Sequence, residues 1–480
     1  MARLRAAQPH WQQRTVNERL RLVGKLSGLI ADNPEVFWAP DAMEESSIRA
    51  YRRSPGEVLA SEVLPLADAC RYVARRGGRV LAKRRLSDRD AVWWMGSIGV
   101  REMREPWGVV LIIGPGNYPL LLPGVQMVQA LAAGNGVLIK PAVGGSSAME
   151  RLKQFCSAAS IPTELIQILP TSPSSAHAAM EIGVDKLLFT GSRKTGQLVA
   201  AASTQSLTPA ALELGGNDPV FVLDEADLDR VARSLAYAMR MNAGQTCIAP
   251  RRVLATAATH AKLLPLLRAQ LLAVDGPPGK MEVTTVGFAT ALQAVKEALA
   301  HGARIVVGGL EDFRTHTEVR PLVLADVMPS MQIARDDLFA PVLSLIEVAN
   351  MEQALIAASE CRYALAASIF GSPIAAGELA RRVLAGCVTI NDCLVPTADP
   401  RVSFGGWQAS GYGVTRGLEG LRELTRLKVV CQRRGRWLPH LSTDSAKLAG
   451  MIQGLLLVQH GRSLSDRWRG IKLLIHEFRK

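Results

Sequence analysis

The chain has 480 residues, a length that predicts at least two domains, each with its own hydrophobic core. Its 48% hydrophobic and 21% charged residues are typical of a globular enzyme and argue against intrinsic disorder. The net charge of +13 would suit nucleic acid, but no basic motif with interleaved aromatic residues accompanies it, so we expect no nucleic-acid partner.

The cysteines and the apolar runs indicate the compartment. Seven cysteines without a C-x-x-C pair argue against a disulfide framework and against a metal site, and they favour the cytoplasm. No run of eighteen apolar residues exists, which excludes a membrane-spanning segment on length. The arginine-rich start, residues 1–21, resembles a transit peptide, but Trp11, Leu20, Val23 and Leu26 recur at helical spacing and favour an ordinary helix.

The first hundred residues predict helices followed by a short extended stretch. Residues 8–84 have helical patterns, with Asn33-Pro34 marking one helix end and Ser54-Pro55-Gly56 a break. Residues 89–104 are short and strand-like. We expect no catalytic group in either part.

From residue 105 apolar strands alternate with helices. Val109–Ile113 is a continuous apolar run closed by glycine and proline, which is typical of a strand buried on both faces. A helix at 122–133 follows, and further strands are predicted at 136–139, 166–169 and 186–189. This alternation predicts an α/β fold with a parallel, doubly wound sheet.

A glycine-rich segment, Gly191-Ser192-Arg193-Lys194-Thr195-Gly196, follows the last of these strands and precedes a predicted helix at 197–203. Free N–H groups and the helix dipole at such a place favour a bound phosphate. The segment matches neither the dinucleotide fingerprint nor a Walker A loop. From the residues alone, an ordinary glycine-rich turn is an equal alternative.

The remainder predicts a second α/β unit, a loop and an edge strand. Strands are expected at 220–223, 252–255, 304–307, 342–348 and 387–390. Residues 392–412 contain proline and glycine and predict a loop, and residues 426–431 predict a closing edge strand.

Two isolated residues are candidates for chemistry. Glu213 lies in an apolar run before paired glycines, where burying a charge is costly. Cys247 follows a small polar turn, Asn242-Ala243-Gly244-Gln245-Thr246, which can leave its N–H free to face a substrate oxygen. Taken singly, a paired carboxylate and a small buried thiol are the commoner alternatives.

Several motifs in a fixed order resemble the aldehyde dehydrogenase superfamily. Glu213-Leu214-Gly215-Gly216 and Gly244-Gln245-Thr246-Cys247 are the paired signature, and the resemblance covers about residues 8 to 432. The other matching motifs are Glu105-Pro106-Trp107-Gly108, Gly116-Asn117-Tyr118-Pro119, Lys140-Pro141, Phe189-Thr190-Gly191-Ser192, Leu338-Phe339-Ala340-Pro341-Val342 and Phe404-Gly405-Gly406.

The resemblance implies three parts and an extension. Residues 1–84 and 105–212 would form a Rossmann-type NAD(P)-binding domain, and residues 213–391 an α/β catalytic domain. Residues 85–104 and 392–432 would form a small β element for oligomerisation, which implies a homodimer. Residues 433–480 lie beyond the resemblance.

The resemblance also implies a covalent mechanism. The Cys247 thiolate would attack an aldehyde, hydride transfer would leave a thioester, and water activated by Glu213 would release the acid. The Asn117 side chain and the Cys247 N–H would stabilise the oxyanion. From the residues alone, a turn residue is the safer interpretation of Asn117.

Cofactor residues are implied one by one. Lys140 resembles the lysine that binds the adenosine ribose, Ser192 the pyrophosphate contact within the Gly191–Gly196 segment, and Phe339 a residue packed near the nicotinamide. Asp337 stands where the family usually has a glutamate for the nicotinamide ribose. Ordinary turn, strand-end and core roles are the alternatives for these residues.

Two further departures bear on specificity. Val143 stands where many NAD-preferring relatives carry a glutamate, and Arg193 and Lys194 offer positive partners for a 2′-phosphate, so NADP is expected to be accepted at least as readily as NAD. Gly116 replaces an aromatic residue before Asn117, which widens the expected aldehyde tunnel.

The chain looks most like the class 3 branch, which handles medium-chain, fatty and aromatic aldehydes. The early position of Asn117, the run Leu207-Thr208-Pro209 and Ile390-Asn391-Asp392 carry this likeness, and apolar Leu394 and Val395 suit such a substrate or plain packing. A second hypothesis is an acylating, coenzyme A-linked dehydrogenase or a fatty thioester reductase. A third hypothesis, from another functional class, is a catalytically silent scaffold.

The C-terminal extension is basic and amphipathic. Residues 433–480 hold ten Lys or Arg against three Asp or Glu, a net charge of +7. Apolar residues recur at helical spacing at 448–456 and at 468–478. These helices either pack on the enzyme body or, through 445–480, lie on a membrane surface as a peripheral anchor.

Overall fold

The computed structural model describes residues 1–38, 53–92, 95, 97–272, 281–316, 318–434, 438, 441 and 445–479. They divide into two compact units. The first comprises Met1–Leu81 and Glu105–Arg426, and the second Ala82–Arg104 and Leu427–Lys480.

The N-terminal segment is helical, as its spacing predicts. Helices α1 (Ala2–Gln13) and α2 (Val16–Asp32) are separated at Thr15, whose hydroxyl accepts from the Glu18 N–H while the Glu18 carboxylate accepts from the Thr15 N–H at 2.8 Å. The predicted end at Asn33-Pro34 is confirmed. The predicted helical stretch at 39–52 lies outside the described residues.

The predicted break at Ser54-Pro55-Gly56 is the start of a helical segment, since Ser54 is extended and the helix begins at Pro55. Ser54 accepts a hydrogen bond from the Glu57 N–H at 3.2 Å, and proline suits a first helical position. Helix α5 (Pro55–Val58) continues through a π-helical turn, Leu59–Val63, into α6 (Leu64–Arg76), which α7 (Gly78–Leu81) follows.

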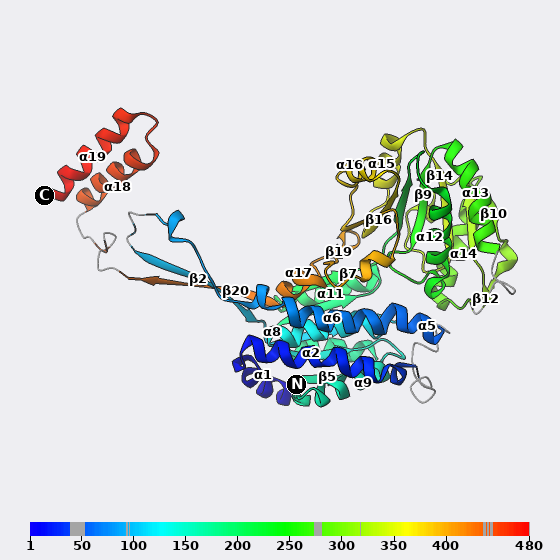
Figure 1. Ribbon diagram of the computed structural model, residues 1–480, viewed down its shortest axis with the longest axis horizontal. Coiled ribbons are helices and arrows are strands. Elements are labelled where there is room, and N and C mark those ends of the chain that lie inside the picture. The colour runs from blue at the N-terminus through cyan, green and yellow to red at the C-terminus, as the bar shows by residue number, and fades with distance from the viewer. Residues whose placement is uncertain are drawn as a thin grey trace. The chain divides into compact units, whose positions relative to one another are not determined.

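A six-stranded sheet is the core of the first half of this unit (Figure 1). Its order is β19-β7-β6-β3-β4-β5, and all neighbours are parallel except β19 with β7. The doubly wound prediction is confirmed, with the reversal of strand order at β3 and β6. The strands are β3 (Val109–Ile113), β4 (Gly136–Lys140), β5 (Ile166–Ile168), β6 (Lys186–Thr190), β7 (Ala210–Glu213) and β19 (Gly411–Tyr412).

Alternation along the strands divides their side chains between two cores. Val110 and Ile112 pack with α2, α6, α8 (Leu121–Ala133) and α9 (Ser146–Ala158). Val109, Leu111 and Ile113 face α1, α10 (Pro173–Ile182) and α11 (Arg193–Gln205). Because both faces are covered, the strands have the continuous apolar character seen in the sequence.

Helix α11 begins at Arg193, four residues before the predicted start. Ser192 is its N-cap, and its hydroxyl accepts from the Thr195 N–H at 3.3 Å. The loop at 191–196 is therefore shorter than predicted, since Arg193 to Gly196 form the first helical turn.

A seven-stranded sheet, in the order β10-β13-β14-β9-β8-β16-β17, is the core of the second half. All neighbours are parallel except β10 with β13. Strands β13 and β16 were not predicted. The strands are β8 (Asp218–Val222), β9 (Pro250–Ala255), β10 (Arg304–Val307), β13 (Leu322–Ala325), β14 (Val342–Glu347), β16 (Ala366–Phe370) and β17 (Cys387–Ile390).

Helices cover both faces of this second sheet. Helices α12 (Leu228–Arg240) and α13 (Ala257–Leu272) pack on one face, and α14 (Thr285–Ala300), α15 (Met351–Ser359) and α16 (Pro373–Ala380) on the other. The segment 392–412, predicted as a loop, is more regular than expected. It contains β18 (Trp407–Gln408), which pairs with β15 (Tyr363–Ala364), and β19, which pairs with β7.

The second unit consists of a small sheet and a helical hairpin. Strand β2 (Ile98–Pro106) lies between β1 (Arg84–Arg85) and β20 (Thr425–Arg433), so the predicted edge strand is present. Helices α18 (Ser445–His460) and α19 (Leu464–Arg479) pack against each other. Among the described residues, no helix is long and apolar enough to cross a bilayer.

Candidate active site

Cys247 follows a turn of unusual backbone geometry after α12. Asn242, Ala243 and Gly244 have successive φ values of 48°, 52° and 68°, the left-handed region that non-glycine residues rarely adopt. At Gly244 an added Cβ would lie 2.9 Å from the Ala340 oxygen. The Arg251 guanidinium donates to the carbonyls of Gly244 and Ala340, so the surrounding structure fixes this turn.

The loop that carries Asn117 is hydrogen-bonded to this turn. Asn117 Nδ2 donates to the Gln245 carbonyl at 3.1 Å, and Asn242 Nδ2 donates to the Asn117 carbonyl at 3.0 Å. The hydroxyls of Tyr118 and Thr246 lie 2.6 Å apart. A loop from the six-stranded sheet is thereby joined to a turn from the seven-stranded sheet.

A buried ion pair supports the Asn117 loop from behind. The Glu62 carboxylate accepts from the N–H groups of Leu120 and Leu121, at 2.7 and 3.0 Å, and pairs with Arg53. Both charged side chains are fully buried, and the Arg53 guanidinium lies 5.5 Å from the Tyr118 ring centroid. A carboxylate at the start of α8 also suits the positive end of the helix dipole.

Glu213 ends β7 and is held by two hydroxyls. Thr190 Oγ1, on the neighbouring strand β6, donates at 3.2 Å, and Thr415 Oγ1 donates to the other carboxylate oxygen. Burial raises the pKa of Glu213, while Arg416 and the two threonine hydrogen bonds oppose the shift. A carboxylate with a raised pKa suits proton transfer near neutral pH.

Two cavities meet at Glu213 and Cys247. One, of about 780 Å³, is lined mainly by apolar side chains, including Leu122, Ile248 and Phe404. The other, of about 1530 Å³, is lined by apolar and polar side chains together, has more charged residues than the first, and runs toward the start of α11; it is called the polar cavity below. Glu213 and Cys247 line both, so a group at this junction is reached from either side.

The Cys247 thiol lies in a desolvating environment. Burial, with smaller contributions from the Glu213 and Asp218 charges, raises the pKa of Cys247 to about 12, and the Arg416 charge opposes this rise. Among the described residues, none accepts a hydrogen bond from the Cys247 N–H. With Asn117 Nδ2, this N–H offers two donors for an oxyanion.

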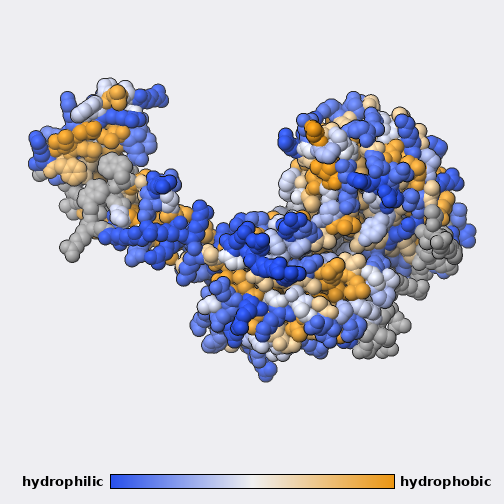
Figure 2. Space-filling view, in the orientation of Figure 1, coloured by the Kyte–Doolittle hydropathy of each residue, from blue (hydrophilic) through white to orange (hydrophobic). Residues whose placement is uncertain are grey.

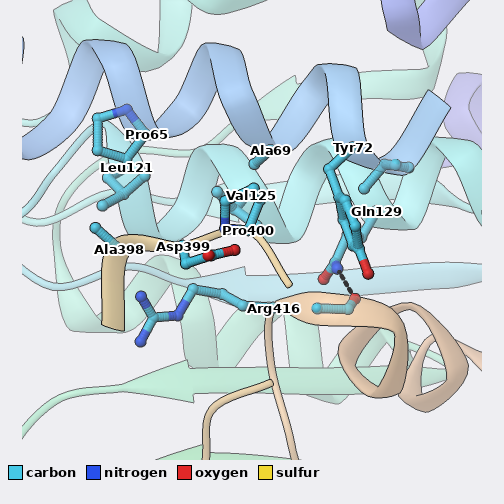
Figure 3. A pocket seen from close by; sticks show the side chains of 12 residues that line it. Pro65, Ala69, Tyr72, Leu121, Val125, Gln129, Ala398, Asp399, Pro400 and Arg416 are labelled. Atoms are coloured by element: carbon cyan, nitrogen blue, oxygen red, sulfur yellow. Dashed lines mark hydrogen bonds between the residues drawn. The ribbon is translucent and has the colours of Figure 1, made fainter. Parts of the chain in front are cut away.

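Arg416 adds a positive charge to the mainly apolar cavity, which Glu213 also lines. Its guanidinium donates to the Thr397 carbonyl at 3.0 Å and lies 4.3 Å from the Phe404 ring centroid. Figure 3 shows a smaller pocket beside it, of about 330 Å³, lined by Tyr72, Gln129 and Asp399 among others. Arg416 lines both this pocket and the apolar cavity.

The polar cavity contains groups that fit a dinucleotide. Asp337 lines it, and within the described chain its Oδ1 is buried without a hydrogen-bond partner. Burial raises the pKa of Asp337 to about 7, although the Arg251 charge opposes this. Ser192, Arg193 and Lys194 line the cavity at the start of α11, where the helix dipole favours an anion.

The structure brings together most of the predicted site residues. Asn117, Gly191, Ser192, Glu213, Cys247, Asp337 and Phe339 all line the polar cavity. Lys140, at the end of β4, and Gly196 are not among the described lining residues. Gly196 is buried in α11, where an added Cβ would lie 2.4 Å from Leu214, so it permits close packing of helix on strand.

Comparison with known proteins assigns the family. The model of the aldehyde dehydrogenase family matches residues 1–430. The chain belongs to this family.

Individual relatives support the same family assignment. The 4,4'-diapolycopene aldehyde oxidase of Methylomonas sp is 28% identical, covering 97% of this chain and 91% of that protein. Aldehyde dehydrogenase family 3 member B1 of Homo sapiens is 32% identical over 65% of this chain and 66% of its own, which supports the class 3 resemblance.

A solved structure shows the same fold. The NADP-dependent glyceraldehyde-3-phosphate dehydrogenase from Bacillus halodurans C-125, complexed with NADP, matches with a TM-score of 0.81 and 28% identity, over 90% of each chain. The predicted α/β architecture of an aldehyde dehydrogenase is therefore confirmed.

Sequence reasoning missed the residues that surround the two central groups. Thr190 lies within a family motif, but the sequence did not indicate that its hydroxyl donates to the Glu213 carboxylate. Thr415 and Arg416 lie some two hundred positions after Glu213, so no local pattern connects them. Glu62 could have been noticed as an acid within an apolar helical stretch.

The charges beside the sulfur predict opposite effects on its reactivity. The thiolate is the nucleophile, and with a pKa of about 12 its fraction rises about tenfold per pH unit across the neutral range. We expect Glu213→Gln to accelerate, and Arg416→Gln to slow, alkylation of Cys247 by neutral iodoacetamide. Arg416→Lys should restore part of the rate.

Peptide-resolved mass spectrometry at several pH values measures this rate, with Cys431, which lies on β20 in the other unit, as the internal reference. Equal rates in both glutamine variants would show that neither charge acts on the sulfur.

Proposed function

We propose that the chain oxidises a medium- to long-chain or aromatic aldehyde to the carboxylic acid with NAD(P)⁺. The observation that carries this proposal is the junction of an apolar and a polar cavity at Cys247 and Glu213. An aldehyde with an apolar tail and a charged dinucleotide can reach these residues through different cavities.

Cys247 is the proposed nucleophile. Its sulfur adds to the aldehyde carbon, and the carbonyl oxygen becomes an oxyanion that Asn117 Nδ2 and the Cys247 N–H stabilise. Asn117 Nδ2 already donates one hydrogen to Gln245, which orients the amide and leaves its second hydrogen for the oxyanion. NAD(P)⁺, when bound, supplies the hydride acceptor, and Asp337, Ser192 and Phe339 would hold it.

Glu213 is the proposed general base for hydrolysis. Thr190 and Thr415 fix its carboxylate at the cavity junction, and burial makes it a stronger base than an exposed carboxylate. It would take a proton from water as that water attacks the Cys247 thioester. The acid then leaves through the apolar cavity, and the thiol is regenerated.

The lining of the apolar cavity supports an apolar substrate. Leu121, Leu122, Met241, Leu394 and Val395 contribute to it. The Methylomonas relative is named for 4,4'-diapolycopene aldehyde, and a relative from Castellaniella defragrans is named for geranial. We therefore assign the tail of the aldehyde to this cavity.

Chain length should govern the rate. Each methylene buried in an apolar pocket is worth about 0.8 kcal/mol, or roughly fourfold in kcat/KM until the cavity is full. We expect kcat/KM for NAD(P)H formation to rise steadily from acetaldehyde to decanal. Added coenzyme A should change neither the rate nor the product.

Cys247→Ala should abolish this activity, whereas Cys431→Ala, which alters a thiol of β20 in the other unit, should retain it. Inactivity of the wild-type chain with every aldehyde would favour a silent scaffold. An acyl-coenzyme A product would favour an acylating, coenzyme A-linked dehydrogenase.

The cofactor proposal is that NADP is accepted at least as readily as NAD. Val143 is 79% exposed and uncharged, so it offers the ribose no carboxylate. Arg193 and Lys194 line the polar cavity and offer cations to a 2′-phosphate.

Introducing a carboxylate should therefore reverse the preference. We expect Val143→Glu to lower kcat/KM with NADP about tenfold and to leave the value with NAD nearly unchanged. Val143→Gln, which adds the same bulk without charge, is the matched control. A wild-type preference for NAD of about a hundredfold, roughly 2.7 kcal/mol, would contradict the proposal.

We further propose a homodimer that uses β20. This strand exposes Leu427 and Val429 on one side and Val430 on the other, an apolar content that is unusual for a free edge strand. A second copy would cover them.

Charged substitutions on β20 should dissociate the dimer. Leu427→Lys with Val429→Lys should yield a monomer in sedimentation equilibrium, because two buried cations would be left unpaired at the interface. Arg426→Lys, on the same strand, should leave the mass unchanged. A monomeric wild-type chain would contradict the proposal.

A further inference from the structure

Helix α19 has two distinct apolar faces. One packs on α18 at Gly454 and Gly470, where an added Cβ at Gly454 would lie 2.7 Å from Leu474 and one at Gly470 2.7 Å from the Gly454 oxygen. The two helices are thus in close backbone contact. The other face is not used in this contact.

The outer face is a continuous apolar stripe. Its residues recur at intervals of four, three, four and three, which places them on one side of the helix. All are exposed, Trp468 by 63% and Phe478 by 60%. The stripe consists of Leu464, Trp468, Ile471, Ile475 and Phe478. Figure 2 shows apolar residues gathered on this hairpin, with hydrophilic residues around them.

Cations border the stripe on both sides. At about 100° per residue, Arg467 projects beside one edge and Lys472 and Arg479 beside the other. The acids lie elsewhere. Glu477 is buried against Gly450 of α18, and Asp466 accepts from the Ser463 N–H at 3.2 Å.

The hairpin as a whole is also cationic. Residues 445–479 contain six Lys or Arg and two Asp or Glu, a net charge of +4. Protein interfaces are depleted in lysine at their centres, whereas an apolar stripe flanked by long basic side chains matches the boundary between lipid tails and anionic headgroups.

We propose that the α18–α19 hairpin binds the surface of an anionic lipid bilayer, with the outer stripe of α19 inserted between the headgroups. The helix lies in the plane of the surface, because its 16 residues are too few to cross a bilayer. Lys472 and Arg479 reach the phosphates while Trp468 and Ile475 enter the apolar layer. This inference does not depend on the proposed reaction.

The test uses the full-length chain and sedimentation with sucrose-loaded vesicles. Binding should be strong to phosphatidylcholine vesicles that contain phosphatidylglycerol, weak to phosphatidylcholine alone, and reduced by salt. Ile475→Glu should lower the partition coefficient about tenfold or more. His476→Glu adds the same acid at the next position in the sequence, which projects away from the stripe, and should change the partition coefficient much less.

Tryptophan emission provides a second measurement. Anionic vesicles should shift the emission to the blue in the wild-type chain, and this shift should be largely lost in Trp468→Phe. Equal binding to both kinds of vesicle, or unchanged binding of Ile475→Glu, would overturn the proposal. So would a wild-type chain that ignores vesicles and loses self-association on Ile475→Glu, because a second copy would then cover the stripe.

Discussion

The site depends on the hydrogen bonds that join the Asn117 loop to the turn before Cys247. The half around the six-stranded sheet supplies Asn117 and Glu213, and the half around the seven-stranded sheet supplies Cys247, so neither half contains the site alone. Asn117 accepts from Asn242 through its carbonyl and donates to Gln245 through its amide, at 3.0 and 3.1 Å. These bonds fix the sulfur and the proposed oxyanion donor relative to each other, which preorganised electrostatic stabilisation requires.

The turn before Cys247 has a backbone conformation that costs free energy, and hydrogen bonds from buried charged side chains stabilise it. Left-handed geometry at Asn242 and Ala243 costs about 1–3 kcal/mol per residue. Arg251 binds two carbonyls around the turn, and Glu62 binds the N–H groups that follow Asn117. Such groups are normally costly to bury. Here both side chains bind backbone groups that would otherwise be free to move, although Arg251 Nε has no hydrogen-bond partner among the described residues.

The sequence predicts most of the strands and the two central residues, Glu213 and Cys247, better than it predicts the residues that surround these two. Apolar runs locate the sheets because strands covered on both faces must be apolar, and family motifs bring Glu213 and Cys247 together. The start of α11 was placed too late, because Ser192 caps a first turn that contains glycine. Thr415 reaches Glu213 across two hundred residues through the pairing of β19 with β7, which no local pattern encodes.

The same desolvation has opposite consequences for the two central groups. It raises the pKa of Glu213, which strengthens a base, and it raises the pKa of Cys247, which weakens a nucleophile. Arg416 lowers both, so it cannot set the difference between them. The hydroxyls of Thr190 and Thr415 act on Glu213 and not on the sulfur. These two threonines therefore lower the pKa of Glu213 without changing that of Cys247. Burial cannot separate the two pKa values in this way, because both groups share the same water-poor junction.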